Sequence, residues 1–217
     1  MPSPVLVDHP LVRCHLTRLR DRATPPEAFR VLSRRLATLL AYEATKDLPT
    51  TPTTVMTPLA EAAGERLTPR VGLVPILRAG LGLVEPVLDL IPDAEVWHLG
   101  LYRDEATARP VAYYKKIPDS EPVDMALVLD PMLATGGSAV SALEVLAKWG
   151  VARTKLLSVI AAVDGIEHVR QRFPDTQIYV CGIDPELNDR KFIVPGLGDA
   201  GDRIFNTLRE ERRKAEG

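Results

Sequence analysis

The sequence lacks the cysteine content and the long apolar runs that mark several protein classes. It has only two cysteines, Cys14 and Cys181, which lie far apart and lack the spacing of metal ligands. We interpret both as reduced, structural thiols. No stretch is apolar over the length needed to span a bilayer. The first residues, Met-Pro-Ser-Pro, have no basic region followed by an apolar run, unlike a signal peptide. These absences predict a cytoplasmic protein with no membrane partner.

An excess of charge of either sign is also missing. The chain carries 27 Lys and Arg against 29 Asp and Glu, for a formal net charge of −2. Bulk electrostatics therefore suggest neither a nucleic-acid partner nor a membrane surface. Apolar residues at 46% and charged residues at 26% are typical of a soluble globular protein. A chain of 217 residues can form a substantial core, and we predict a single domain over residues 1–217.

Several common catalytic motifs are absent as well. A Walker P-loop is excluded because Gly-x-x-x-x-Gly-Lys-[Ser/Thr] does not occur, and there is no Gly-x-Ser-x-Gly nucleophile elbow. Gly196-x-Gly198-x-x-Gly201 matches a dinucleotide fingerprint, but too few residues follow it for a βαβ unit. Four histidines lack metal-ligand spacing and are interpreted as surface or structural residues: His9, His15, His98 and His168.

The stretch from Met125 to Trp149 is the most informative part of the sequence. Met125–Leu129 is a continuous apolar run, which predicts a strand buried on both faces of a parallel sheet. Asp130 follows this strand directly, at the carboxyl end where open α/β sheets bind ligands. Beyond a loop, apolar residues recur on one helical stripe: Val140, Leu143, Leu146 and Trp149.

The loop between this strand and helix contains Thr135-Gly-Gly-Ser138. Its glycines allow backbone N–H groups to close around an anion, its hydroxyls add hydrogen bonds, and the helix N-terminus supplies a favourable dipole. The same four residues also suit an ordinary helix start with a serine cap. Asp130 favours the anion site, because a carboxylate there can accept hydrogen bonds from vicinal ribose hydroxyls. The ligand implied is a sugar phosphate.

Strand and helix patterns alternate through the rest of the chain and predict an α/β fold with a mostly parallel sheet and helices on both faces. Thr24-Pro-Pro-Glu27 is typical of a capping box that begins a helix running to about Lys46. Val55–Leu59 is predicted as a short strand or extended arm and is a candidate dimer contact. Other predicted strands cover 71–76, 94–103, 111–117, 155–163 and 177–184, and other predicted helices end at Leu90 and span 165–173.

Five segments resemble one known family. Leu129–Ala139 resembles the 5-phosphoribosyl-1-pyrophosphate (PRPP) loop of the phosphoribosyltransferases, in the version found in uracil phosphoribosyltransferases. Four further segments match that family in its order and at its spacing, within a similarity that runs from about Val5 to Thr207: Asp8–Leu11, Val74–Gly82, Gly100–Asp104 and Pro195–Arg203. The sequence is therefore identified as similar to uracil phosphoribosyltransferases, which belong to the type I phosphoribosyltransferase superfamily.

The resemblance implies a type I phosphoribosyltransferase fold with two additions to the sheet. A β-hairpin at about 100–118 would be a flap over the active site, where its closure would keep water from a reactive sugar cation. A C-terminal segment at about 185–207 would be a hood that binds the base. Residues 208–217 extend beyond the match and are interpreted as a solvated helical tail. On the flap, Lys115 and Lys116 are interpreted as exposed charges.

The implied reaction is transfer of 5-phosphoribosyl from PRPP to N1 of uracil, giving UMP and diphosphate in pyrimidine salvage. Arg78 follows a buried strand, and its local sequence suits either a second anion-binding loop or a solvated loop. The resemblance implies that Arg78 and Arg103 both bind the pyrophosphate. The implied catalytic residues are these two arginines, Asp130 and Asp199. The implied PRPP-binding set is Arg78, Arg103, Asp130, Pro131, Met132, Leu133, Ala134, Thr135, Gly136, Gly137, Ser138 and Asp199. Mg²⁺ would enter with PRPP and would need no cage of protein ligands.

The glycine-rich C-terminal segment is predicted to read the base through its backbone. Uracil presents acceptor, donor and acceptor groups along one edge, and glycines allow close approach of the main chain. The resemblance assigns uracil binding to Ile193, Gly198, Asp199 and Ala200. Cytosine would set an amino group against a backbone donor, which can give discrimination of roughly 10⁴-fold. Phe192 stands where the family is expected to have tyrosine, so a role for that hydroxyl does not carry over.

Other interpretations stay open at this stage. The same fold could serve a pyrimidine-responsive RNA-binding regulator or a nucleotide sensor without turnover, and another base such as xanthine or orotate could replace uracil. Pro131 stands where most phosphoribosyltransferases have a second acid, although the uracil branch shares the single acid. The family suggests a homodimer or a larger homo-oligomer, and some relatives are allosteric enzymes activated by a nucleotide such as GTP. The sequence decides neither oligomeric state nor activation.

Overall fold

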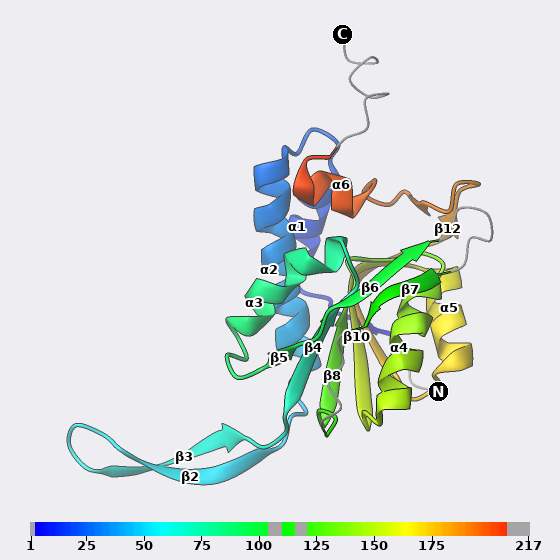
Figure 1. Ribbon diagram of the computed structural model, residues 1–217. Helices are drawn as coiled ribbons and strands as arrows, with labels where there is room; N and C mark the ends of the chain where they lie inside the picture. Colours follow the sequence, from blue (N-terminus) through cyan, green and yellow to red (C-terminus); the bar gives the residue numbers. More distant parts are fainter. Residues whose placement is uncertain (1–2, 104–109, 116–120, 208–217) are drawn as a thin grey trace.

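The computed structural model describes residues 3–103, 110–115 and 121–207, and side chains only within 3–98 and 121–207. Its centre is a parallel sheet with strand order β1-β11-β10-β8-β4-β5, with β9 pairing β10 beyond the end of β8 (Figure 1). The strands are β1 (Val5–Leu6), β4 (Val71–Pro75), β5 (Glu95–Val96), β8 (Met125–Leu129), β9 (Met132–Leu133), β10 (Arg153–Ala162) and β11 (Gln177–Asp184). The predicted α/β fold with a mostly parallel sheet is confirmed.

Helices cover both faces of this sheet, as Figure 1 shows. One face packs against α1 (Pro10–Arg20), α2 (Pro26–Ala44) and α3 (Val84–Leu88), and the other against α4 (Gly137–Trp149) and α5 (Val163–Arg172). The helices bury regular apolar stripes, such as Leu32, Leu36 and Leu40 of α2. Every residue of β4 and of β8 is buried, as expected for strands covered on both faces. Two separate apolar cores result, one on each side of the sheet.

In the described part of the chain before β8, two antiparallel hairpins lie outside the central sheet. The strands β2 (Thr50–Met56) and β3 (Glu61–Leu67) form an antiparallel arm that extends away from the sheet and helices (Figure 1). The predicted extended arm is confirmed, but it begins earlier than Val55, and β3 was not predicted. The second hairpin pairs β6 (Leu99–Arg103) with β7 (Pro110–Lys115), so the hairpin predicted at about 100–118 is present, while its role as a flap stays a prediction. Its tip at 104–109 and residues 116–120, with Lys116, lie outside the described residues.

Some predicted local features are wrong. The single strand over 94–103 is two strands, because the chain leaves the central sheet once the N–H of Trp97 has bonded to the Leu73 carbonyl oxygen. The predicted capping box is absent, since the N-cap of α2 is Pro25 and no side chain caps the helix. The helix predicted to end at Leu90 is a 3₁₀ turn, η1 (Ala79–Leu83), followed by the short α3.

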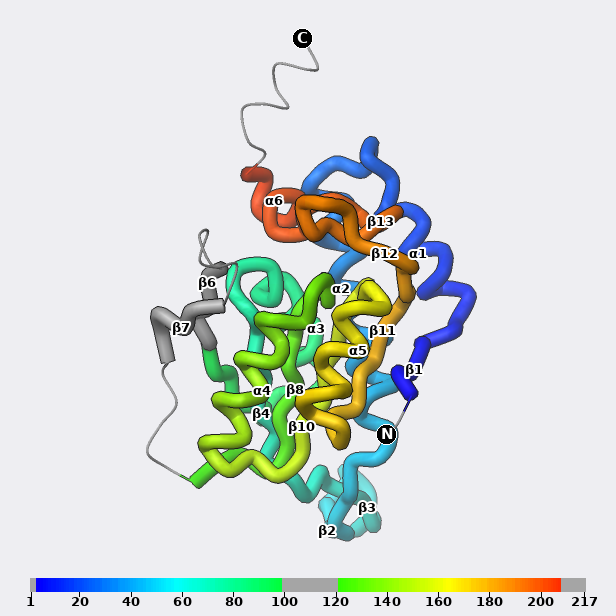
Figure 2. Tube along the Cα trace, turned by 90° about the vertical axis from the view of Figure 1, so that its right-hand side faces the viewer, coloured from blue at the N-terminus to red at the C-terminus, as the bar shows by residue number. Residues whose placement is uncertain are grey.

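The C-terminal part of the described chain lies over the carboxyl ends of the strands. It consists of a strand pair, β12 (Glu186–Leu187) with β13 (Ile193–Val194), and the helix α6 (Ala200–Phe205) (Figures 1 and 2). Cys14 is exposed and Cys181 buried, and both are free thiols. Burial raises the pKa of Cys181 to about 12, in line with a structural thiol. Among the described residues, no helix has the length and apolar content to cross a membrane.

Candidate active site

The loops that follow β4 and β8 meet at the carboxyl edge of the sheet. The N–H of Ile76 donates to the Leu129 carbonyl oxygen at 3.0 Å, which joins the ends of the two strands. Gly80 packs so closely on this carbonyl that an added Cβ would collide with it. The loop that carries Arg78 is therefore held directly beside Asp130. This close approach requires glycine and explains part of the Val74–Gly82 motif.

Asp130 lies at the end of β8 with its side chain only partly exposed. Burial raises the pKa of its carboxyl group to about 7, and a hydrogen bond from the Met132 N–H to Oδ1 at 3.2 Å opposes this shift. The carboxyl group thus titrates close to neutral pH. In its ionised form it has acceptor capacity left for hydroxyl groups of a ligand.

The predicted phosphate loop begins α4. Gly136 is the N-cap residue with φ of +76°, and the helix starts at Gly137, so Ser138 is the second helical residue and not a cap. Ser138 nonetheless lies in the first turn, whose residues are all described and include no acidic side chain. A positive φ and a helix N-terminus without a carboxylate suit an anion.

Helix α5 packs against this loop and supports it. An added Cβ at Gly136 would lie 2.8 Å from the Gly165 carbonyl oxygen, and one at Gly165 would collide with the carbonyl of Ala134. His168 Nδ1 donates to the Thr135 carbonyl oxygen at 2.8 Å. Sequence reasoning assigned no function to Gly165 or His168, because nothing in the local pattern connects α5 with the loop.

The side chains of the remaining residues in the predicted PRPP segment have different surroundings. Leu133 is buried in the core at 1% exposure, so only its backbone faces the loop. Pro131 is buried, and its carbonyl oxygen accepts from the Ile160 N–H at 3.1 Å. Met132 reaches toward the hood, where its sulfur accepts a hydrogen bond from the Ala200 N–H at 3.3 Å. This contact links the phosphate half of the site to the base half.

The two predicted pyrophosphate ligands differ in how far the structure describes them. The Arg78 side chain is 60% exposed, and its Nη2 lies 3.3 Å from Oδ1 of Asp202 on α6. This ion pair bridges the loop after β4 and the hood. Arg103 is the last residue of β6, and its side chain lies outside the described residues, as does that of Lys115.

Comparison with known proteins identifies the family. A family model described as uracil phosphoribosyltransferase matches residues 5–207. The chain belongs to the uracil phosphoribosyltransferase family. It is 58% identical over 207 residues to the uracil phosphoribosyltransferase of Roseiflexus sp. (strain RS-1) and 50% identical over 208 residues to that of Symbiobacterium thermophilum, each alignment covering 95% of this chain and 100% of the relative. Its fold resembles a solved structure of the AQ2163 protein from Aquifex aeolicus, with a TM-score of 0.89 and 35% identity over 95% of this chain and 100% of that one.

The predicted base-binding residues come together next to Met132, whose sulfur accepts from the Ala200 N–H. Gly198 has a φ of +80°, and Ile193 and Ala200 are buried on either side of the loop. Asp199 is the N-cap of α6, where its Oδ1 accepts from the Asp202 N–H at 2.9 Å. The second Asp199 oxygen has no hydrogen bond among the described residues, which leaves it an acceptor for a ligand.

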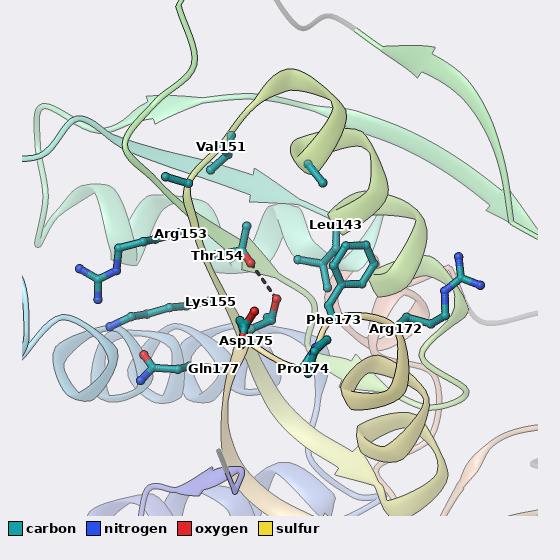
Figure 3. A pocket seen from close by; sticks show the side chains of 13 residues that line it. Leu143, Val151, Arg153, Thr154, Lys155, Arg172, Phe173, Pro174, Asp175 and Gln177 are labelled. Atoms are coloured by element: carbon teal, nitrogen blue, oxygen red, sulfur yellow. Dashed lines mark hydrogen bonds between the residues drawn. The ribbon is translucent and has the colours of Figure 1, made fainter. Parts of the chain in front are cut away.

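A separate pocket lies at the opposite end of the central sheet. Figure 3 shows it between the end of α4 and the starts of β10 and β11, with Leu143 and Phe173 on one wall. Its cavity volume is about 580 Å³, and the Thr154 and Thr176 hydroxyls inside it are 2.8 Å apart. Ligands of parallel sheets bind at the carboxyl ends of strands, so this pocket is not the candidate active site.

Proposed function

We propose that this chain transfers the 5-phosphoribosyl group of PRPP to N1 of uracil, giving UMP and diphosphate. The observation that carries the proposal is spatial. The segments matched to the family are far apart in the sequence, yet the loop of Arg78, the carboxyl group of Asp130, the phosphate loop and the hood meet at one edge of the sheet. Family membership over residues 5–207 supports the choice of uracil as the base.

We assign the phosphate contacts by the charge and backbone geometry of each loop. The 5′-phosphate would lie at residues 135–138, against the N-terminus of α4. The ribose hydroxyls would donate to Asp130 in its ionised form, and Arg78 would hold the pyrophosphate with Arg103. Leaving-group charge would then develop beside fixed cations, which is how electrostatic stabilisation lowers such barriers.

Positioning carries the rest of the proposed mechanism. The transition state at the sugar carbon is cation-like, so no covalent intermediate with the protein is needed. Among the described residues, no three His, Cys, Asp or Glu side chains gather as a metal site. Mg²⁺ would be held by the phosphate oxygens of PRPP, because hard cations prefer phosphate oxygens, and would neutralise the charge of the leaving group there.

The hood would read uracil through backbone groups of Ile193, Gly198 and Ala200, with Asp199 contacting PRPP as well as the base site. The Ala200 N–H donates to the Met132 sulfur in this structure. Uracil would take over this donor, since a carbonyl oxygen is a much better acceptor than a thioether. The flap hairpin would cover the bound substrates.

Assembly and regulation are further proposals. Near the tip of the β2–β3 arm, Val55, Met56 and Leu59 are 51%, 72% and 96% exposed, and we propose that the arm contacts a second copy of the chain in a homodimer. Sedimentation equilibrium would measure the mass. Activation by a nucleotide such as GTP and a cytoplasmic location stay predictions from the sequence.

The deciding experiment is UMP formation from PRPP, Mg²⁺ and uracil, run beside cytosine, orotate and hypoxanthine. Turnover with uracil alone is expected. Turnover with another base would keep the phosphate half of the proposal and overturn the base half. PRPP binding without any product would favour a nucleotide sensor over an enzyme.

A further inference from the structure

Two arginines outside the site predicted from the sequence hold the base-reading loop in place. The loop contains Gly196 with a φ of +61° and Gly198 with a φ of +80°. Glycines at such positions lose more conformational freedom on folding than other residues, so the loop needs external contacts to keep one conformation. In both Figure 1 and Figure 2 the turn between α1 and α2 lies beside the hood, and contacts between α2 and α6 agree with this view.

The first arginine is Arg20, the last residue of α1. Its guanidinium donates to both carboxylate oxygens of Asp184, at 2.7 Å each, and to the Gly196 carbonyl oxygen at 2.7 Å. Asp184 in turn accepts from the Gly196 N–H at 3.1 Å. The side chain of Asp184 is 6% exposed and that of Arg20 is 23% exposed. Both polar groups of the Gly196 backbone are therefore fixed by one desolvated, bidentate ion pair.

The second arginine is Arg203, within α6. Its guanidinium stacks over the Phe29 ring at 4.3 Å from the centroid. Nη1 donates to the carbonyl oxygens of Leu19 and Leu197, each at 2.8 Å, and Nη2 donates to that of Asp21 at 2.6 Å. One planar group thus joins the α1–α2 turn to the residue that precedes Gly198. Lysine could not reproduce this arrangement, because it lacks the fork geometry and the planar face.

We propose that Arg20, Asp184 and Arg203, here called the hood brace, are positioning residues that set the affinity and specificity for the base. The proposal deepens the proposed function and rests on it. Arg20 and Arg203 hold Gly196 and Leu197 from the α1–α2 side, while Ala200 on the far end of the loop points its N–H at Met132. The backbone groups expected to read uracil are thereby fixed before the base arrives. Preorganisation of this kind strengthens binding by removing an ordering cost.

The phosphate half of the site has a separate support. Its loop rests on α5 through Gly165 and His168, which belong to the opposite face of the sheet. Loss of the hood brace should therefore impair recognition of the base and leave recognition of PRPP intact. A merely structural role would instead change every kinetic parameter together.

The test compares Arg20→Lys and Arg203→Lys with Arg172→Lys. Arg172 makes a 2.7 Å surface pair with Glu144, far from the hood, and serves as the matched control. We expect the KM for uracil to rise about tenfold or more in the two brace variants, with kcat and the KM for PRPP changed less than about twofold. The preference for uracil over cytosine should fall, and the control should match wild type.

Hydrogen exchange of the full-length chain supplies a readout that needs no turnover. In both brace variants the amides of residues 196–200 should exchange faster, while those of 135–140 should keep wild-type protection. Unchanged hydrogen exchange at residues 196–200 would show that the hood brace does not order the loop, whatever the activity of the variants. Faster exchange with an unchanged KM for uracil, or an equal rise in both KM values, would overturn its role in base recognition. Absence of UMP formation by the wild type would overturn the proposed function instead.

Discussion

Replacing Asp130 with asparagine should make the protein more stable at alkaline pH and at the same time less active. The carboxyl group has a pKa of about 7 in the folded chain against an ordinary value of 3.8. The folded state therefore binds more protons than the unfolded state between these values. By linkage, the stabilising contribution of the protonated group is fully present below about pH 4 and is lost as pH rises through about 7. Asparagine does not titrate, so its variant escapes this loss.

The size of the effect follows from the same two pKa values. Their difference corresponds to at most about 4 kcal/mol in the free energy of unfolding. The side chain is partly exposed, and solvent screening reduces this to about 1–2 kcal/mol. We expect Asp130→Asn to gain that amount relative to wild type between pH 5 and pH 8. Urea unfolding at both values measures it, with exposed Asp93→Asn as the control that should show no change in this comparison.

Activity should move in the opposite direction. An asparagine amide cannot accept hydrogen bonds from two vicinal hydroxyls as a carboxylate does, so kcat/KM for PRPP should fall by about 10²-fold or more. In wild type this parameter should rise with pH through about 7, because it reports the free enzyme, in which Asp130 must ionise. The Asp130→Asn profile should lack that rise. A stability gain that is equal at pH 5 and pH 8 would refute the assigned titration, and wild-type activity in the variant would remove Asp130 from the mechanism.

Three further substitutions test other parts of the structure. Gly165→Ala places a Cβ against carbonyls of the phosphate loop, so the free energy of unfolding should fall by about 1–3 kcal/mol and the KM for PRPP should rise. The control, Gly64→Ala on the arm, meets only ordinary contact and should match wild type in both assays. Asp47→Asn leaves the buried ammonium of Lys155 without its carboxylate, which should cost about 1–3 kcal/mol in urea unfolding, and unchanged stability would contradict this. Ser158→Ala removes a buried hydroxyl that has no hydrogen-bond partner among the described residues, so calorimetry should show equal or slightly higher stability, and a clear loss would reveal a partner.

The sequence predicted those parts whose cause is local. The strand Met125–Leu129 is found with the predicted bounds, because burial on both faces leaves a continuous apolar run. The loop that begins the next helix was equally visible, because Gly136 adopts a left-handed conformation that few other residues adopt; its role in phosphate binding stays a prediction. The arm strand Glu61–Leu67 was missed because none of its residues is buried and so no apolar alternation marks it. Helix α6 was missed because its six residues are too few to show a helical period.

Long-range contacts were beyond sequence reasoning for a different reason. Arg203 and Leu19 are 184 positions apart, and Arg20 and Asp184 are 164 apart. Charge alone does not distinguish these arginines from the many exposed ones, since their partners are backbone carbonyls and a single distant carboxylate. Arg203 lies within a matched motif, which was the one available signal, but the motif does not say what the side chain contacts.

The hood brace also affects when the two halves of the candidate site can be completed during synthesis of the chain. The loop of Arg78, Asp130, the phosphate loop and the helix α5 that supports it come from residues 71–172, all of which are synthesised before the hood. The brace instead joins the α1–α2 turn, made early, to Arg203, made late. All residues of the phosphate half and of its support are thus present in the nascent chain before the hood and Arg203 have been synthesised. Incomplete chains that stop before α6 would be expected to retain sugar-phosphate contacts while having no means of choosing a base.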